Sequence, residues 1–286
     1  YWLRMDNLHE LTQIVNRIKT RRIEIIGKER TEYGKLTKKL YDGIVEGKYN
    51  NDREAAIDIY GENFVPNNYT RLKTILTEKL INTLFFIDVS DYNFSDAQHA
   101  YVECEKLRTA VKILLSRGAK GMAIKLAEKL IRKSLRYEFT DITLEIGRIL
   151  RRHFRTYDPN SEKEKVYHEI VEYYHKILGA EIEVENSYEL IIREISIGKR
   201  SKEKEIFIVS NLEIIDKYFP KLESYKLGQF AHLAKIKNQE YLQDSEGIAL
   251  SCKNAIQYFE KKESVFSNVI SNKFYNRYSF FLMHLQ

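Results

Sequence analysis

Apolar residues recur along most of the chain with the spacing of one face of an α-helix. Over residues 8–18, Leu8, Leu11, Ile14 and Ile18 fall on a single stripe, and the same spacing returns in later segments. Three prolines and twelve glycines in 286 residues leave long uninterrupted stretches, which favours helices over a turn-rich β-sandwich. The pattern therefore predicts an all-α protein.

Local signals mark where some of these helices begin and end. Asn51 stands three residues before Glu54, which is the spacing of a capping box, and Gly61 follows as a stop signal. The pattern predicts helices over 8–18, 31–46, 51–61, 69–86, 96–114, 122–136, 142–154, 163–178, 186–197, 202–218, 221–242, 245–262 and 272–286. The segments 21–27, 180–185 and 205–210 alternate weakly as strands do, but three isolated strands do not make a sheet-based fold.

The predicted helices fall into two groups. Residues 1–90 form a small N-terminal helical subdomain, and residues 91–286 form an array of helical hairpins. The polar stretch at 156–163 is a candidate break within the array. Met5 is a candidate start of the native chain. The uncapped apolar end leads us to expect that the chain is a fragment or has been trimmed at Gln286.

Small residues on the packed faces of the array carry a resemblance to a known family. They are Ala100, Ala110, Ala123, Ala127, Ala231, Ala234, Ala249 and Ala255. With them, the segments 96–154 and 221–286 resemble the tetratricopeptide-repeat (TPR) family of α-solenoids, and 118–135 looks like the second helix of one of its hairpins. The resemblance implies an irregular α-solenoid with a concave surface that binds a peptide, a partner protein or a second copy of the chain.

The segment 117–155 carries most of the positive charge. It holds eleven Lys and Arg against four Asp and Glu, a local charge of +7, whereas the whole chain is +6. Its candidate anion-binding residues are Lys125, Lys129, Arg132 and Arg136, which form one helical stripe, and Arg148, Arg151, Arg152 and Arg155 on the next helix. A solvated helix face is the alternative, and a favourable interaction with the helix dipole explains part of the second cluster.

Three helices over 31–87 are similar in arrangement to a helix-turn-helix domain. Arg71, Lys73 and Lys79 lie on the third of them and are candidate nucleic-acid contacts. The loop at 61–67 contains a proline and is longer than the usual turn of three to four residues. A helical cap on the array is therefore the alternative interpretation of this trio.

Other chemistry is not indicated. The sequence holds no phosphate-binding loop, nucleophile elbow or CxxC pair, so we expect neither catalysis nor a cofactor. His168, Glu172 and His175 share a helix face, but their order is not that of a zinc protease and we expect no metal. Two distant cysteines indicate reduced thiols in a cytoplasmic protein. No apolar run is long enough to cross a membrane.

These observations predict a non-enzymatic scaffold or adaptor that binds a protein or peptide partner through a helical-repeat groove with a basic surface. The alternative is a nucleic-acid-binding regulator, in which the N-terminal trio contacts DNA or RNA and the array senses a peptide or dimerises. Homo-oligomers are compatible with both hypotheses.

Overall fold

The computed structural model describes residues 5–17, 31–85, 96–159, 161–197 and 200–262. Every regular element in these ranges is an α-helix, as the apolar spacing predicts. The chain divides into two compact units, Tyr1–Asp91 and Tyr92–Gln286. Each unit has its own hydrophobic core and is described by itself.

The N-terminal unit packs its helices around a core of leucines. The helices are α1 (Met5–Arg17), α2 (Glu32–Val45), α3 (Asp52–Tyr60) and α4 (Pro66–Leu84). Leu40 from α2 and Leu72, Leu76 and Leu80 from α4 are fully buried there. The three leucines of α4 are spaced by four residues, so they form one stripe toward the core.

The predicted ends of α3 are confirmed. Asn51 Oδ1 accepts a hydrogen bond from the backbone N–H of Glu54 at 3.0 Å, and the Glu54 carboxylate accepts one from the N–H of Asn50 at 2.8 Å. Gly61 ends the helix with a φ of +86°, where a residue with a Cβ would be strained. These signals act over three or four residues, which is why the sequence alone reveals them.

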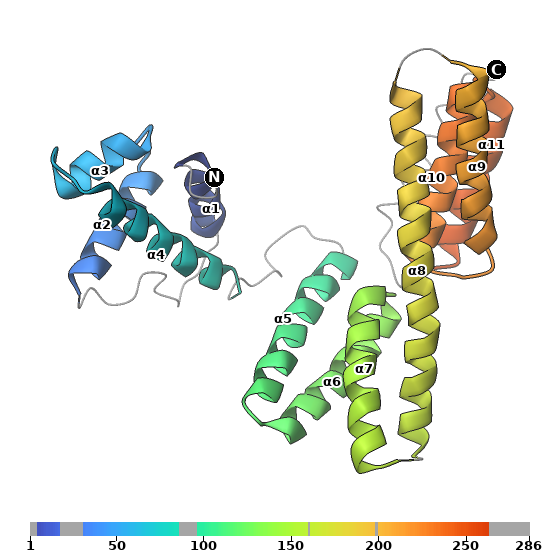
Figure 1. Cartoon of the computed structure of the whole chain (residues 1–286), viewed down its shortest axis with the longest axis horizontal. Coiled ribbons are helices and arrows are strands. Elements are labelled where there is room, and N and C mark those ends of the chain that lie inside the picture. The colour runs from blue at the N-terminus through green and yellow to red at the C-terminus, as the bar shows by residue number, and fades with distance from the viewer. Residues whose placement is uncertain (1–4, 18–30, 86–95, 160, 198–199, 263–286) are drawn as a thin grey trace. The chain divides into compact units, whose positions relative to one another are not determined.

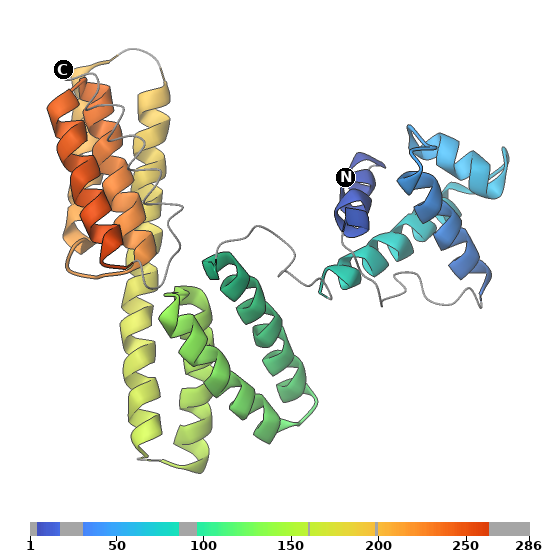
Figure 2. The same cartoon turned by 180° about the vertical axis from the view of Figure 1, so that it is seen from behind.

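The C-terminal unit is arranged along one long helix, α8. Its helices are α5 (Asp96–Ser116), α6 (Lys120–Arg136), α7 (Thr140–Tyr157), α8 (Glu162–Ser196), α9 (Lys202–Tyr218), α10 (Tyr225–Leu242) and α11 (Ser245–Glu260). As Figures 1 and 2 show, α7 lies beside the first half of α8, with α6 packed on α7 and α5 on α6, and α9, α10 and α11 lie beside its second half. Consecutive helices therefore pack as antiparallel neighbours.

The continuity of α8 corrects the sequence prediction. Two helices, 163–178 and 186–197, were expected there, with a weakly alternating segment at 180–185 between them. The structure has one helix, because Ala180, Val184 and Ile191 are buried on one helical face of the same core. The segment at 205–210 likewise lies inside α9. The predictions for 21–27 and 272–286 lie outside the described residues.

The candidate break at 156–163 corresponds to the turn between α7 and α8. These two helices pack closely across it, and Gly147 lets them do so: a Cβ there would lie 3.1 Å from Cγ2 of Val171. A Cβ at this distance would be closer than ordinary van der Waals contact, so a larger residue at this position would require Val171 to shift. The small residues predicted on the packed faces are buried, except that Ala110 and Ala249 are half-buried.

A buried carboxylate joins the two halves of the C-terminal unit. Glu181 on α8 is 3% exposed and accepts hydrogen bonds from Thr140 Oγ1 at 2.8 Å and Ser224 Oγ at 2.6 Å. Thr140 begins α7, and Ser224 precedes α10. Burial raises the pKa of Glu181. Since both donors are buried as well, this contact fixes the start of α7 against the start of α10.

Candidate anion-binding groove

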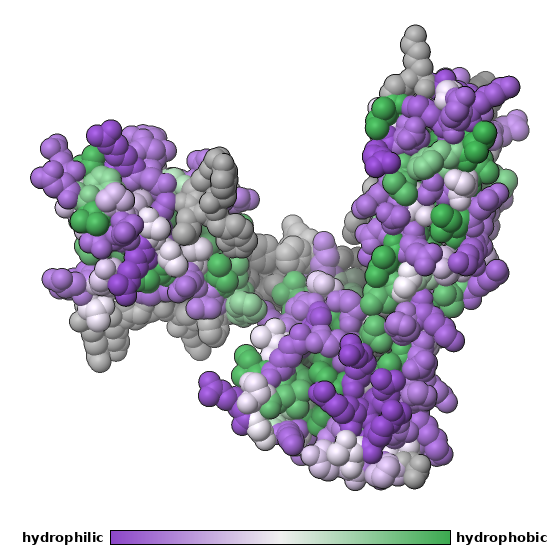
Figure 3. Space-filling model, in the orientation of Figure 1, coloured by the Kyte–Doolittle hydropathy of each residue, from purple (hydrophilic) through white to green (hydrophobic). Residues whose placement is uncertain are grey.

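The four arginines of α7 line one groove in the C-terminal unit. It has a volume of about 600 Å³ and runs between α5 and α7. Its lining residues are Lys112, Leu115, Glu145, Arg148, Ile149, Arg151, Arg152, Arg155 and Thr156. In Figure 3 a strongly hydrophilic patch lies over α7. The structure thus brings Arg148, Arg151, Arg152 and Arg155 together, as candidate binding residues on one surface.

The apolar pattern of α7 explains why the arginines face outward. Ile142, Ile146 and Leu150 are fully buried against the core shared with α5 and α6. Their four-residue spacing defines the inner stripe of the helix. Arg148 and Arg152 fall outside that stripe and are exposed. Burial of the apolar face of α7 therefore leaves these two arginines on the opposite, exposed face.

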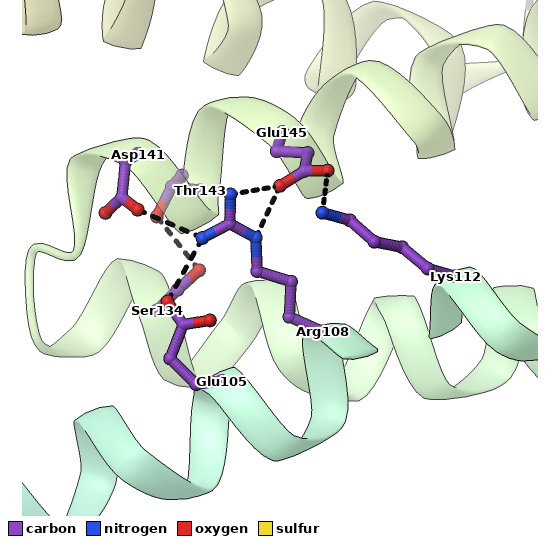
Figure 4. A network of polar contacts seen from close by, with 7 residues as sticks. All are labelled: Glu105, Arg108, Lys112, Ser134, Asp141, Thr143 and Glu145. Carbon is purple, nitrogen blue, oxygen red and sulfur yellow. Dashed lines mark hydrogen bonds and ion pairs between the residues drawn. The ribbon is translucent and has the colours of Figure 1, made fainter. Parts of the chain in front are cut away.

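An ion-pair network forms one end of the groove (Figure 4). Arg108 on α5 donates to the carboxylate of Glu145 on α7 and also lies 3.0 Å from Glu105 Oε1 and 3.2 Å from Asp141 Oδ2. Lys112 Nζ lies 2.7 Å from the other oxygen of Glu145. Burial alone would raise the pKa of Glu145, but hydrogen bonds from Lys112 and Arg108 outweigh burial and lower it. The Glu145 carboxylate is therefore ionised, and it is paired with two cations, Arg108 and Lys112.

Two of the four arginines are already paired with α8. Arg151 Nη1 lies 3.4 Å from Glu172 Oε1, and Arg155 donates two hydrogen bonds to Glu164 Oε1 at 2.8 and 2.9 Å. Arg148 and Arg152 have no ion pair within the ranges that the structure describes, and both are exposed. The groove therefore presents two uncompensated guanidinium groups.

The basic stripe of α6 is a separate surface. In Figure 1 α6 lies between α5 and α7 and passes behind α7. Lys125, Lys129, Arg132 and Arg136 are all exposed, and none of them lines the groove. Arg136 lies over the ring of Tyr137, 5.5 Å from its centroid. Both clusters lie in one basic segment of the sequence, whereas the structure places them on separate surfaces.

The cations predicted on the third helix of the N-terminal trio differ in accessibility. Lys73 is only 6% exposed and lies 2.7 Å from Asp52 Oδ1, so little of this predicted nucleic-acid contact is accessible. Arg71 is exposed above the ring of Tyr33, and Lys79 is half-buried. The loop before this helix is also shorter than expected, because α4 begins at Pro66.

The histidines and cysteines form no reactive cluster in the described ranges. His168, Glu172 and His175 are exposed on α8. No group of three His, Cys, Asp or Glu side chains in these ranges is arranged to hold a metal ion. Cys104 and Cys252 are free and buried, and burial raises the pKa of Cys104 to about 11. Nor is any described helix both long and apolar enough to cross a membrane.

Sequence reasoning missed the α5 side of the groove. Lys112 and Leu115 stand more than thirty residues before the α7 arginines, as the numbering shows. A hairpin partner was predicted for this region, but the contact face of each helix was not. Comparison with known proteins offers no further guide: no family model, no curated protein and no solved structure matches the chain.

Proposed function

We propose that this protein is a non-enzymatic interaction scaffold. In this proposal its helical hairpins form a TPR-like array, and the groove between α5 and α7 binds an acidic segment of a partner protein. The observation that supports it most directly is the pair of exposed, uncompensated arginines Arg148 and Arg152 in a groove that also holds Leu115 and Ile149. Charged and apolar contacts side by side suit a peptide with acidic and apolar residues.

The size of the groove suits a short extended peptide. Its α7 wall runs from Glu145 to Thr156, which at 1.5 Å per residue is about 16 Å of helix. An extended chain covers that length with about five residues. Arginine forks hold carboxylates through paired, charge-assisted hydrogen bonds, which are stronger than neutral ones.

Fluorescence anisotropy with the full chain tests this proposal. The probe is a fluorescein-labelled octapeptide of alternating Glu and Leu, and the matched control peptide has Gln in place of Glu. We expect the Glu peptide to bind, and to bind more weakly when salt rises from about 50 to 200 mM. Arg148→Gln with Arg152→Gln should weaken binding about tenfold or more, because two charge-assisted contacts are lost.

A charge-matched variant separates the groove from general charge. Lys125→Gln with Lys129→Gln removes the same charge from the exposed face of α6 and should change the affinity less than threefold, since these residues lie outside the groove. Equal weakening in both variants, or no binding of the Glu peptide, would contradict the proposal.

A second candidate function is nucleic-acid binding through the α6 stripe. The observation that favours it is that Lys125, Lys129 and Arg132 are exposed without an ion pair in the described ranges. With Arg136 these cations form one helix face that suits a phosphate backbone, and binding there would depend steeply on salt. In this alternative the N-terminal unit adds Arg71 and Lys79 as further contacts.

Anisotropy with a labelled DNA duplex and a labelled RNA single strand, at about 50 and 200 mM salt, tests the second candidate. The informative variant carries Lys125→Glu, Lys129→Glu, Arg132→Glu and Arg136→Glu. Salt-sensitive binding that this variant loses would support it. Absence of binding by the unchanged chain would reject it and leave the peptide groove as the remaining proposal.

A further inference from the structure

The positions of Arg148 and Arg152 are not explained by the stability of α7. Cations stabilise a helix through its dipole only within the last turn. Since α7 ends at Tyr157, that turn contains Arg155 but neither Arg148 nor Arg152. Both also have like-charged neighbours three or four residues away, which disfavours the helix. Residues that break a local rule without a local gain are candidates for a binding role.

The remaining arginines are held away from this pair by α8. Glu172 binds Arg151 and Glu164 binds Arg155. This leaves two guanidinium groups one helical turn apart, whose Cβ atoms are separated by about 6 Å in such a geometry. Two forks at that spacing can converge on one small anion, because each arginine side chain is longer than the separation.

We infer that the partner segment bound in the groove carries a phosphorylated serine or threonine, clamped by Arg148 and Arg152. The inference rests on the proposed function and names the partner's chemistry. A phosphomonoester carries a charge of about −1.5 to −2 and three acceptor oxygens. It therefore matches two guanidinium forks in both charge and hydrogen bonds. A single carboxylate carries one charge and two oxygens, which satisfy one fork.

Lys112 is placed to add a third contact at low cost. Its Nζ lies 2.7 Å from Glu145 Oε1, but Glu145 is also bound by Arg108. Lys112 can turn toward a phosphate without leaving the Glu145 carboxylate unpaired, because Arg108 still neutralises it. Leu115 and Ile149 then lie beside the clamp as contacts for an apolar neighbour of the phosphorylated residue.

Three peptide pools distinguish this inference from the broader proposal. Each pool has one fixed central residue, phosphoserine, serine or glutamate, with degenerate flanking positions, and binding to the full chain is measured by anisotropy. We expect the phosphoserine pool to bind at least tenfold more tightly than the serine pool and severalfold more tightly than the glutamate pool. The last difference follows from the second fork, which glutamate leaves unused.

Charge-conserving variants test the clamp itself. Arg148→Lys with Arg152→Lys keeps the charge but removes the forks, so it should weaken the phosphoserine pool, which uses both forks, severalfold more than the glutamate pool, which uses one. Lys112→Gln should weaken the phosphoserine pool to a smaller extent. The control variant on α6, Lys125→Gln with Lys129→Gln, should leave the binding of all three pools unchanged.

Each outcome decides between the two levels of the proposal. If the glutamate pool binds as tightly as the phosphoserine pool, the phosphate inference is wrong and the acidic-peptide groove stands. If the arginine-to-lysine variant binds phosphoserine as the unchanged chain does, the clamp is wrong. If no pool binds, both the inference and the proposed function fail.

Discussion

His232 on α10 is a titratable side chain buried among aromatic rings. It is 8% exposed, and its ring centroid lies 5.3 Å from that of Phe219 and 5.4 Å from that of Tyr258. Its Nε2 has no hydrogen-bond partner in the described ranges. Burial, with a smaller contribution from Lys235, lowers the pKa of His232 to about 4. The folded protein therefore holds this imidazole neutral.

We expect His232 to make the C-terminal unit sensitive to acid. The unfolded chain protonates this histidine near pH 6.5, whereas the folded chain does so only near pH 4. Stability is therefore lost as the pH falls between these values, by about 2–3 kcal/mol in total. Thermal unfolding of the full chain and of His232→Phe, measured from pH 7 to pH 4, checks this. The variant should lose less stability, and parallel losses would contradict the prediction.

Glycines on α7 and α8 give a matched test of helix packing. A Cβ on Gly147 would lie 3.1 Å from Val171, whereas one on Gly179 would have nothing within 4 Å. Gly147→Val should therefore lower the free energy of unfolding by about 1–3 kcal/mol through overpacking. Gly179→Ala should raise it by about 0.5–1 kcal/mol, because alanine favours the helix. Urea unfolding measures both, and similar effects would show that α7 and α8 do not pack as described.

Replacing Arg148 and Arg152 should weaken binding without lowering the stability of the fold. Arg148 lies three residues from Arg151 and four from Arg152, and Arg152 lies three residues from Arg155. Each such like-charge pair costs about 0.2–0.5 kcal/mol. The double variant Arg148→Gln with Arg152→Gln should therefore unfold at an equal or higher urea concentration than the unchanged chain. Its free energy of unfolding should be higher by roughly 0.5 kcal/mol. A clear loss of stability would mean that these arginines are structural.

At the scale of the whole molecule, the two units have separate cores. One cluster lies entirely within Tyr1–Asp91, and the other three lie within Tyr92–Gln286. A chain segment with its own core is expected to fold alone. Residues 92–286 produced by themselves should therefore be helical by circular dichroism and melt cooperatively. Their melting temperature should match one transition of the full chain, and an unfolded fragment would refute the independence of the units.

Signals that act within one or two helical turns were readable in the sequence. The apolar spacing predicted an all-helical chain, and Asn51, Glu54 and Gly61 predicted the ends of α3. The alternation at 180–185 was ambiguous, because a short apolar run fits either a strand or a helix face. Packing resolved it, since Ala180, Val184 and Ile191 meet one core only if α8 is continuous.

Contacts between helices decided the rest. Lys73 looked like a surface cation until the structure placed it against Asp52, twenty-one residues away. The eleven cations of 117–155 looked like one basic surface, but packing put the α6 stripe and the α7 groove on different surfaces and added Lys112 to the groove. The sequence by itself determined the helices and their charge, because those depend on near neighbours. Only the tertiary structure decided which charges are buried, paired or uncompensated, because that depends on residues far apart in the chain.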